Sequence, residues 1–250
     1  MILEIDAGNS RIKWRIRQPD AMAGYGVLLT KNVACLGADV EEVGVPRLVR
    51  LSSVCGAEVD SVVVELAEKW GAELVVAKSS AEAMGVRSGY HEPAAMGVDR
   101  WLAIVAAYHH VKTACVVVDA GSAVTVDLLD HTGSHLGGYI VPGFNLMNRA
   151  LFSGTDAGAA ERDIDPRGII DTSPGESTRE AVHHGLLLMV LGLVEGALLK
   201  LPPGSASIVL TGGDAEVLHQ QLGMRAVVRP DLVLEGLSLI TGFPEGLEEG

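Results

Sequence analysis

The sequence contains one short pattern twice, once at the N-terminus and once near the middle. Residues 4–10 read Glu-Ile-Asp-Ala-Gly-Asn-Ser, and residues 117–123 read Val-Val-Asp-Ala-Gly-Ser-Ala. In each copy apolar or alternating runs flank the shared Asp-Ala-Gly, which predicts a strand, a tight turn and a second strand. A chance match is the alternative, since Asp-Gly turns are common. The matching strands favour a duplicated core, with one copy in domain 1–112 and one in domain 113–250.

Strand and helix patterns alternate along the rest of the chain. Helical spacing of apolar residues predicts helices over Glu58–Trp70 and Gly97–Lys112, and a long one over Thr178–Lys200. Short apolar runs predict strands over Arg47–Val54, Glu73–Ala77, His135–Val141, Ala206–Leu210 and Arg225–Val228, and shorter helices over Asn145–Phe152 and Leu232–Ile240. This alternation predicts an α/β fold.

Composition excludes several classes of protein. With 19 Lys and Arg against 32 Asp and Glu, the 250-residue chain has a net charge of −13. Such a chain repels nucleic acid. Three cysteines without a C-x-x-C pair indicate a reducing compartment. The longest apolar stretch, Gly185–Leu199, is short for a bilayer and carries Glu195, which predicts a buried helix. We therefore expect a cytoplasmic protein with neither a nucleic acid nor a membrane as partner.

The two Asp-Ala-Gly turns are candidate phosphate sites. Backbone N–H groups of Asp6–Lys13 can line a concavity for phosphate oxygens, with Lys13 as a cation and Asp6 as a ligand of Mg²⁺ through water. The second turn, Asp119–Thr125, adds the hydroxyls of Ser122 and Thr125. Two such turns facing each other across a cleft describe a nucleotide clamp, and two ordinary hairpins are the alternative. A third glycine turn, Thr211–Asp214, is a candidate surface for a flat ligand such as adenosine, and an ordinary packing turn is the alternative.

A further candidate site lies at the start of the helix predicted from Gly97. The helix N-terminus attracts anions, and Arg100 can bind a carboxylate. Asp99 has two interpretations: compensation of the helix dipole, or a general base that accepts a proton from a substrate hydroxyl. Tyr90 lies just upstream on a loop.

Taken together, these segments resemble the type III pantothenate kinases. The motifs Asp6–Lys13, Gly97–Arg100, Asp119–Thr125 and Gly137–Gly143, and the helix start at Ser177-Thr178, follow that family's order and spacing, over Met1 to about Phe243. The family belongs to the acetate and sugar kinase, Hsp70 and actin superfamily. The resemblance implies two domains with a duplicated actin-like (ribonuclease H-like) core, with nucleotide and substrate in the cleft.

The resemblance also implies a role for each matched residue. It implies ATP-dependent phosphorylation of pantothenate to 4′-phosphopantothenate, the first step of coenzyme A biosynthesis, by a homodimer that uses Mg²⁺ with ATP. Asp99 would be the catalytic base, and Asp119 would hold a monovalent cation, K⁺ or NH₄⁺. ATP-binding positions would be Asp6, Ala7, Gly8, Asn9, Ser10, Arg11, Ile12, Lys13 and Ser122; pantothenate-binding positions would be Tyr90, Gly97, Val98, Asp99, Arg100 and Thr178.

Two departures and one alternative accompany this interpretation. Ser10 and Ser122 stand where many members carry Thr, which keeps the hydroxyl and loses a methyl group. The alternative is a non-catalytic regulator of the Bvg accessory factor type. The presence of Asp6, Lys13, Asp99 and Arg100 favours the enzyme, because a regulator needs no base beside two phosphate turns.

Overall fold

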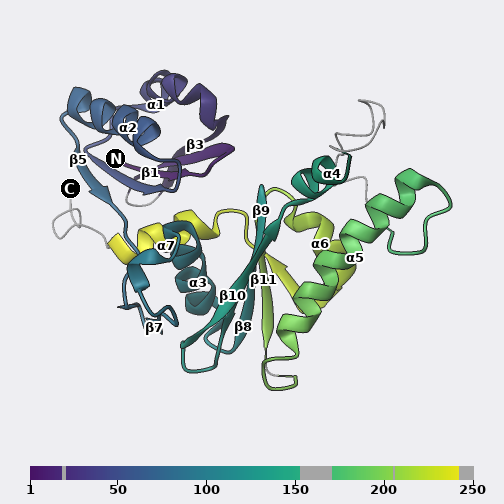
Figure 1. Ribbon diagram of the computed structural model, residues 1–250. Helices are drawn as coiled ribbons and strands as arrows, with labels where there is room; N and C mark the ends of the chain where they lie inside the picture. The colour runs from purple at the N-terminus through teal and green to yellow at the C-terminus, as the bar shows by residue number, and fades with distance from the viewer. Residues whose placement is uncertain (19–20, 153–170, 205, 242–250) are drawn as a thin grey trace. The chain divides into compact units, whose positions relative to one another are not determined.

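The computed structural model describes residues 1–18, 21–152, 171–204 and 206–241, and the chain groups into two compact units. Unit 1 comprises Met1–Met84, Tyr90–Ala106 and the segment that begins at Leu232, and unit 2 comprises Gly85–Gly89 and Ala107–Asp231. Each unit contains one five-stranded sheet (Figure 1).

The sheet of unit 1 is mixed and has the order β3-β2-β1-β4-β5. Strands β2 and β3 run antiparallel to their neighbours, whereas β4 and β5 extend the sheet in parallel from β1. Its elements are β1 (Ile2–Ala7), β2 (Arg11–Gln18), β3 (Ala21–Leu29), the 3₁₀ helix η1 (Thr30–Cys35), α1 (Leu36–Val43), β4 (Leu48–Ser53), α2 (Ala57–Trp70) and β5 (Glu73–Val76).

The sheet of unit 2 repeats this topology. Its order, β10-β9-β8-β11-β12, combines an antiparallel meander with two parallel strands in the same sequence of connections. The elements are β8 (Cys115–Ala120), β9 (Ala123–Leu129), β10 (His135–Pro142), α4 (Phe144–Phe152), α5 (Thr178–Leu198), β11 (Ser207–Thr211), α6 (Ala215–Leu222), η5 (Gly223–Arg225) and β12 (Ala226–Val228). The duplicated α/β core predicted from two Asp-Ala-Gly turns is confirmed.

The remaining elements follow the two sheets in sequence. A small pair of strands, β6 (Glu82–Ala83) and β7 (Val86–Arg87), and the turn η2 (Pro93–Ala95) precede α3 (Val98–Val111), and α7 (Leu232–Thr241) follows β12. Every strand and helix predicted above is present within a few residues. Local sequence patterns did not predict β3, β6, β7, α1 or the 3₁₀ helices. The acidic sequence of residues 242–250 predicts a frayed tail, and these residues lie outside the described part of the chain.

Helix α7 joins unit 1 although it follows unit 2 in sequence. Arg15 Nη2 donates to the Leu234 carbonyl oxygen at 2.9 Å and to Ser238 Oγ at 3.0 Å, and Arg15 Nε bonds the buried Glu4 carboxylate at 2.6 Å. Arg50 Nη1 contacts the same carboxylate at 2.9 Å. These bonds attach α7 to β1, β2 and β4. The boundary expected between residues 112 and 113 stays a prediction.

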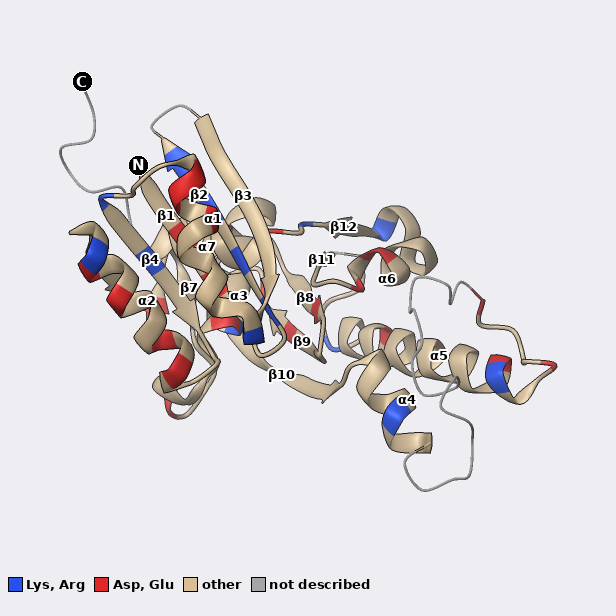
Figure 2. Ribbon diagram, turned by 90° about the horizontal axis from the view of Figure 1, so that it is seen from above, with Lys and Arg blue, Asp and Glu red and all other residues tan. Residues whose placement is uncertain are grey.

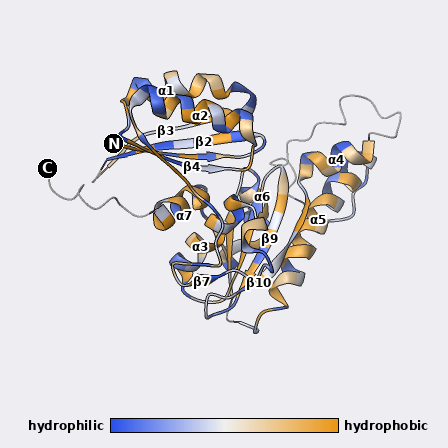
Figure 3. Ribbon diagram, turned by 60° about the vertical axis from the view of Figure 1, so that its left-hand side comes forward, coloured by the Kyte–Doolittle hydropathy of each residue, from blue (hydrophilic) through white to orange (hydrophobic). Residues whose placement is uncertain are grey.

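Helix α5 is the apolar helix of unit 2, and Figure 3 shows it hydrophobic along most of its length. By length and composition alone, its 21 residues from Thr178 to Leu198 could cross a membrane, because the helix extends beyond the shorter apolar stretch from Gly185 that the sequence analysis judged short for a bilayer. One face packs into the core of unit 2 through Leu187, Val190 and Val194, as a core helix does. The other face is exposed, since Leu188 is 56% and Met189 64% exposed. The helix is therefore buried along one face only rather than fully buried.

Candidate functional site

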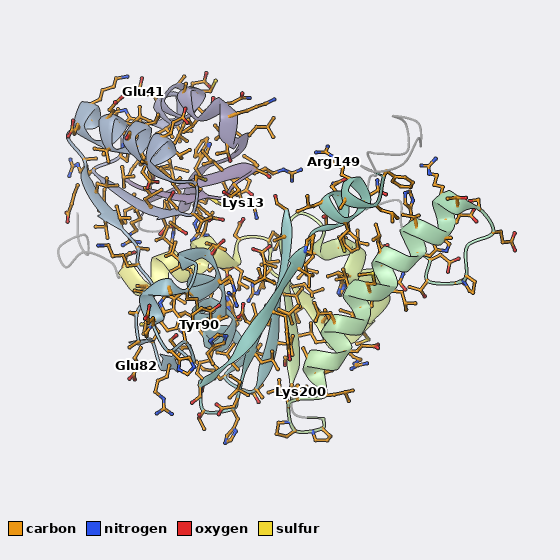
Figure 4. The ribbon with its side chains drawn as sticks, in the orientation of Figure 1. Lys13, Glu41, Glu82, Tyr90, Arg149 and Lys200 are labelled. Atoms are coloured by element: carbon orange, nitrogen blue, oxygen red, sulfur yellow. The ribbon has the colours of Figure 1, made fainter. Side chains whose placement is uncertain are left out.

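The first Asp-Ala-Gly turn, proposed above as a phosphate site, has the predicted strand–turn–strand form. Strand β1 ends at Ala7 and β2 begins at Arg11, and the Gly8 N–H closes the turn by donating to the Arg11 carbonyl oxygen at 3.0 Å. Asp6 lies directly opposite Lys13 in the β1–β2 pair, so the two side chains share one face of the hairpin. Asn9 and Ser10 are exposed at the tip of the turn, and Figure 4 labels Lys13 on β2.

Two residues beyond this motif contact its backbone. Thr30 lies at the start of η1 and Cys55 just after β4, and both reach the Gly8 carbonyl oxygen. Burial, and then the charges of Asp60 and Asp6, raise the pKa of the Cys55 thiol. The thiol is therefore protonated near neutral pH and can act as a donor. Sequence reasoning missed both residues, because no local pattern links them to the turn.

The second Asp-Ala-Gly turn, the other candidate phosphate site, is built from three glycine-containing segments of unit 2. Gly121 N–H donates to the Ala123 carbonyl oxygen at 3.0 Å, and Gly143 N–H donates to that of Ser122 at 3.0 Å. Gly212 follows β11, which pairs with β8 so that Thr211 lies opposite Asp119. A Cβ atom on Gly212 would lie 2.4 Å from Asp119 Oδ1, so only glycine allows this approach. The structure thus brings the predicted adenosine-side turn against Asp119.

The two turns differ at one informative position. In the β8–β9 pair the residue opposite Asp119 is Thr125, where the β1–β2 pair places Lys13 opposite Asp6. The first carboxylate therefore has a fixed cation beside it on the hairpin, and the second has a hydroxyl in the corresponding place. The second turn is also one residue shorter between its last paired residues.

The start of α3 brings together Tyr90, Asp99 and Arg100 within unit 1. Asp99 Oδ1 accepts a hydrogen bond from the Arg100 backbone N–H at 2.7 Å, which satisfies one of the amides left unpaired at a helix N-terminus. Arg100 is only 7% exposed, and its Nη1 donates to the Tyr90 hydroxyl at 2.6 Å. The guanidinium carbon also lies 5.6 Å from the centre of the Tyr90 ring. Tyr90, labelled in Figure 4, thus holds Arg100 in place.

A buried pair in unit 2 anchors the segment that leads to Tyr90. His135 Nε2 lies 2.9 Å from Asp127 Oδ1, and the Gly89 N–H donates to His135 Nδ1 at 3.4 Å. A Cβ atom on Gly89 would lie 2.1 Å from the His135 carbonyl oxygen. Tyr90 follows Gly89 directly in the chain. Neither His135 nor Asp127 was a predicted site residue.

Thr178 is the first residue of α5 in unit 2, and it is exposed. Ser177 caps the helix, since its Oγ accepts the Glu180 N–H at 3.2 Å. Tyr90, Gly97, Val98, Asp99 and Arg100 belong to unit 1. The structure therefore places Thr178 at the predicted helix start but not in the unit that holds the other proposed pantothenate residues.

Similarity to known proteins was found over almost the whole chain. The family model described as type III pantothenate kinase matches residues 2–200. Proteins named type III pantothenate kinase are 40% identical in Ectopseudomonas mendocina (strain ymp) and 38% identical in Chromohalobacter salexigens. The first match covers 96% of this chain and 98% of the relative, and the second covers 98% and 88%.

Solved structures share the fold at low sequence identity. A protein from Campylobacter jejuni assigned to the Baf family of transcriptional activators is 20% identical, with a TM-score of 0.64 over 95% of this chain and 96% of its own. A protein from Sinorhizobium meliloti assigned as a 2-dehydro-3-deoxygalactonokinase is 16% identical, with a TM-score of 0.57 over 95% and 97%. At such identities the likeness shows the fold alone, and it confirms the duplicated actin-like core.

Proposed function

This chain belongs to the type III pantothenate kinase family, and from that premise we propose which of its residues carry out the reaction. Members phosphorylate pantothenate with ATP in coenzyme A biosynthesis, and the chain is a phosphotransferase of this kind. The observation that carries the function is 40% identity to a named member over 96% of the chain. The non-catalytic alternative is not favoured, because the transcriptional activator that shares the fold is only 20% identical.

We assign ATP binding to the two Asp-Ala-Gly turns. The first, Asp6 through Lys13, presents an exposed tip on a hairpin whose base is held by hydrogen bonds. Backbone amides in such a turn bind phosphate oxygens, and the Lys13 ammonium adds a charge that falls on the same face as Asp6. Ser122 supplies the corresponding exposed hydroxyl on the second turn.

Asp6 is a suitable protein ligand for the divalent cation that accompanies ATP. The described residues contain no group of three or more His, Cys, Asp or Glu side chains that could hold a metal ion by themselves. Mg²⁺ in such sites needs only one or two carboxylates, because phosphate oxygens and waters complete its shell. A half-buried carboxylate at the end of β1 meets this need. When bound, the ion offsets charge on the phosphate oxygens.

We assign the acceptor side of the reaction to the start of α3. The substrate hydroxyl oxygen forms a bond to the γ-phosphorus, the bond from that phosphorus to the bridging oxygen of ADP breaks, and the hydroxyl proton passes to the Asp99 carboxylate. Arg100, held by Tyr90, binds the substrate carboxylate. Gly97 and Val98 complete this surface, and Thr178 is a further proposed contact.

We propose that Asp119 holds K⁺ or NH₄⁺. Its carboxylate faces Thr125 rather than a lysine, and the carbonyl oxygen of Ala120 lies close by, as the contacts of Gly212 show. An oxygen-rich site of this kind suits a monovalent cation, and the negative charge of the phosphates increases the need for one.

The assignments predict a dependence of the rate on the salt present. With Mg²⁺, ATP and pantothenate, ADP release should be several-fold faster in K⁺ or NH₄⁺ than in Na⁺, and Asp119→Asn should abolish this difference. Asp130→Asn, a change in another turn of unit 2, serves as a control that keeps the salt effect. Equal rates in the three salts contradict the cation assignment, and absence of pantothenate-dependent ADP release in every salt contradicts the kinase assignment.

We propose that the protein is a cytoplasmic homodimer that binds neither nucleic acid nor membrane. Acidic residues recur along α2 (Figure 2), in keeping with the net charge of −13. Apolar side chains are exposed on three elements of unit 2, which favours burial against a second copy. These are Leu136, Tyr139 and Ile140 on β10, Leu146 and Leu151 on α4, and Leu188 and Met189 on α5.

Sedimentation tests the dimer. The wild type should sediment as a dimer at micromolar concentration, and Met189→Glu should shift it toward the monomer, because a carboxylate cannot be buried there without a partner. Met224→Glu makes the same change at an exposed position on η5 and should leave sedimentation unchanged. A fully active wild-type monomer overturns this proposal.

A further inference from the structure

Thr30 is bonded to both sides of the first phosphate turn. Its Oγ1 donates to the Gly8 carbonyl oxygen at 2.6 Å, and its backbone N–H donates to the Ser10 carbonyl oxygen at 3.1 Å. These two carbonyls flank Asn9, the residue at the tip. A single residue outside the turn therefore restrains the peptide groups on either side of that tip.

Cys55 adds a second donor to the same carbonyl. Its Sγ lies 2.9 Å from the Gly8 carbonyl oxygen and 3.1 Å from that of Ala7. The Ala7 carbonyl oxygen already accepts the Val54 N–H at 3.0 Å. The hydrogen bond from the thiol therefore restrains mainly the Gly8 carbonyl. The Gly8 oxygen thus points between Thr30 and Cys55.

The direction of this carbonyl determines where the next amide points. In a trans peptide the C=O of one residue and the N–H of the next point in opposite directions, and the described residues contain no cis peptide bond. With the Gly8 oxygen directed at Thr30 and Cys55, the Asn9 N–H is directed away from them. Asn9 is exposed, so a ligand outside the turn can reach this amide.

We propose that Thr30, assisted by Cys55, is a positioning residue that directs the Asn9 amide toward the phosphates of ATP. The inference rests on the proposed assignment of the first turn to ATP. An amide already oriented before ATP arrives loses less freedom on binding, so the contribution of Thr30 lies in nucleotide affinity. Pantothenate affinity should not depend on it.

The test compares two substitutions of Thr30 in the full-length protein. Thr30→Val keeps the shape and removes the hydroxyl, and should raise KM for ATP about fivefold while kcat and KM for pantothenate stay within about twofold. Thr30→Ser restores the hydroxyl and should return KM for ATP to near the wild-type value. Calorimetric titration with ADP, without pantothenate, should show the same order of affinities.

Two further variants separate the possible causes. Thr241→Val removes another 2.6 Å hydroxyl-to-carbonyl bond, within α7, and should lower thermal stability without changing KM for ATP. Cys55→Ala removes the second donor and should raise KM for ATP about twofold, which tests the proposal even if Thr30→Val does not fold. A Thr30→Val protein that loses kcat and both affinities together, without rescue by Thr30→Ser, overturns it.

Lys13→Met distinguishes this proposal from the assignment of the first turn to ATP binding, on which it rests. If Lys13→Met weakens ATP binding and Thr30→Val does not, the positioning role of Thr30 is wrong and the ATP assignment stands. If neither weakens ATP binding, the assignment of the first turn itself is wrong.

Discussion

Replacing Asp99 with Asn should lower kcat by about 100-fold or more, because the amide cannot accept the proton of the substrate hydroxyl. The substitution retains an oxygen in place of Oδ1, so the hydrogen bond from the Arg100 N–H is kept. KM for ATP should change little, since the proposed ATP-binding positions lie on the two Asp-Ala-Gly turns. Steady-state kinetics with each substrate varied in turn measures these quantities.

The alternative role of Asp99, compensation of the helix dipole, predicts a different outcome. Loss of a charge in the first turn of α3 would cost about 0.3–1 kcal/mol of stability and leave turnover nearly intact. Asp39→Asn is a suitable control, because Asp39 is an exposed acidic residue in the first turn of α1. It should show only the stability change. Near-normal turnover in Asp99→Asn with a lowered Tm would decide for the dipole role.

Replacing Gly212 with Ala should nearly abolish activity and lower the free energy of unfolding by about 2–5 kcal/mol. Gly212 has φ +92°, which is unfavourable for a residue with a Cβ atom. That atom would lie 2.4 Å from both the Ala120 carbonyl oxygen and Asp119 Oδ1. Because backbone is involved, the clash displaces the second phosphate turn. We expect weaker binding of ATP and loss of the K⁺ effect.

Gly223→Ala separates backbone strain from this collision. Gly223 also has a positive φ, +60°, but no atom lies within 4 Å of its Cβ position. Its replacement should cost about 1–3 kcal/mol and leave activity unchanged, because its ψ of −145° also lies outside the left-handed helical region. Chemical denaturation and ADP-release assays on both variants measure the difference. Equal losses of activity in the two would show that Gly212 is needed for its φ alone, and not for its approach to Asp119.

The parts of the fold that the sequence predicted correctly are locally encoded. Central strands such as β1 and β8 are mostly apolar because both faces are buried, with Glu4 in β1 as an exception, and each runs into an Asp-Ala-Gly turn. The start of α3 was predicted from Gly97 and the apolar spacing that follows. Strand β3 was missed because it is an exposed edge strand with a weak pattern. Its Gly26 leaves room for Trp14, a contact that local sequence does not reveal.

The residues around the proposed site are brought together by contacts between distant parts of the chain. Thr30 and Cys55 reach the same carbonyl from positions 22 and 47 residues away in the chain. Gly212 meets Asp119 only because β11 lies beside β8. Neither contact leaves a periodic signal, since each depends on the pairing of strands rather than on the spacing of neighbours.

The sequence by itself determined the repeated strand–turn–strand units, the helix that carries Asp99, and the family, because turn glycines and apolar periodicity act over a few residues. Only the tertiary structure decided that α7 packs in unit 1. Glu4 is buried, and its charge requires partners, which Arg15 and Arg50 provide. Arg15 also binds the carbonyl of Leu234 on α7. A buried charge needs oppositely charged or hydrogen-bonding partners nearby in the folded chain, and sequence order does not show which residues those partners are.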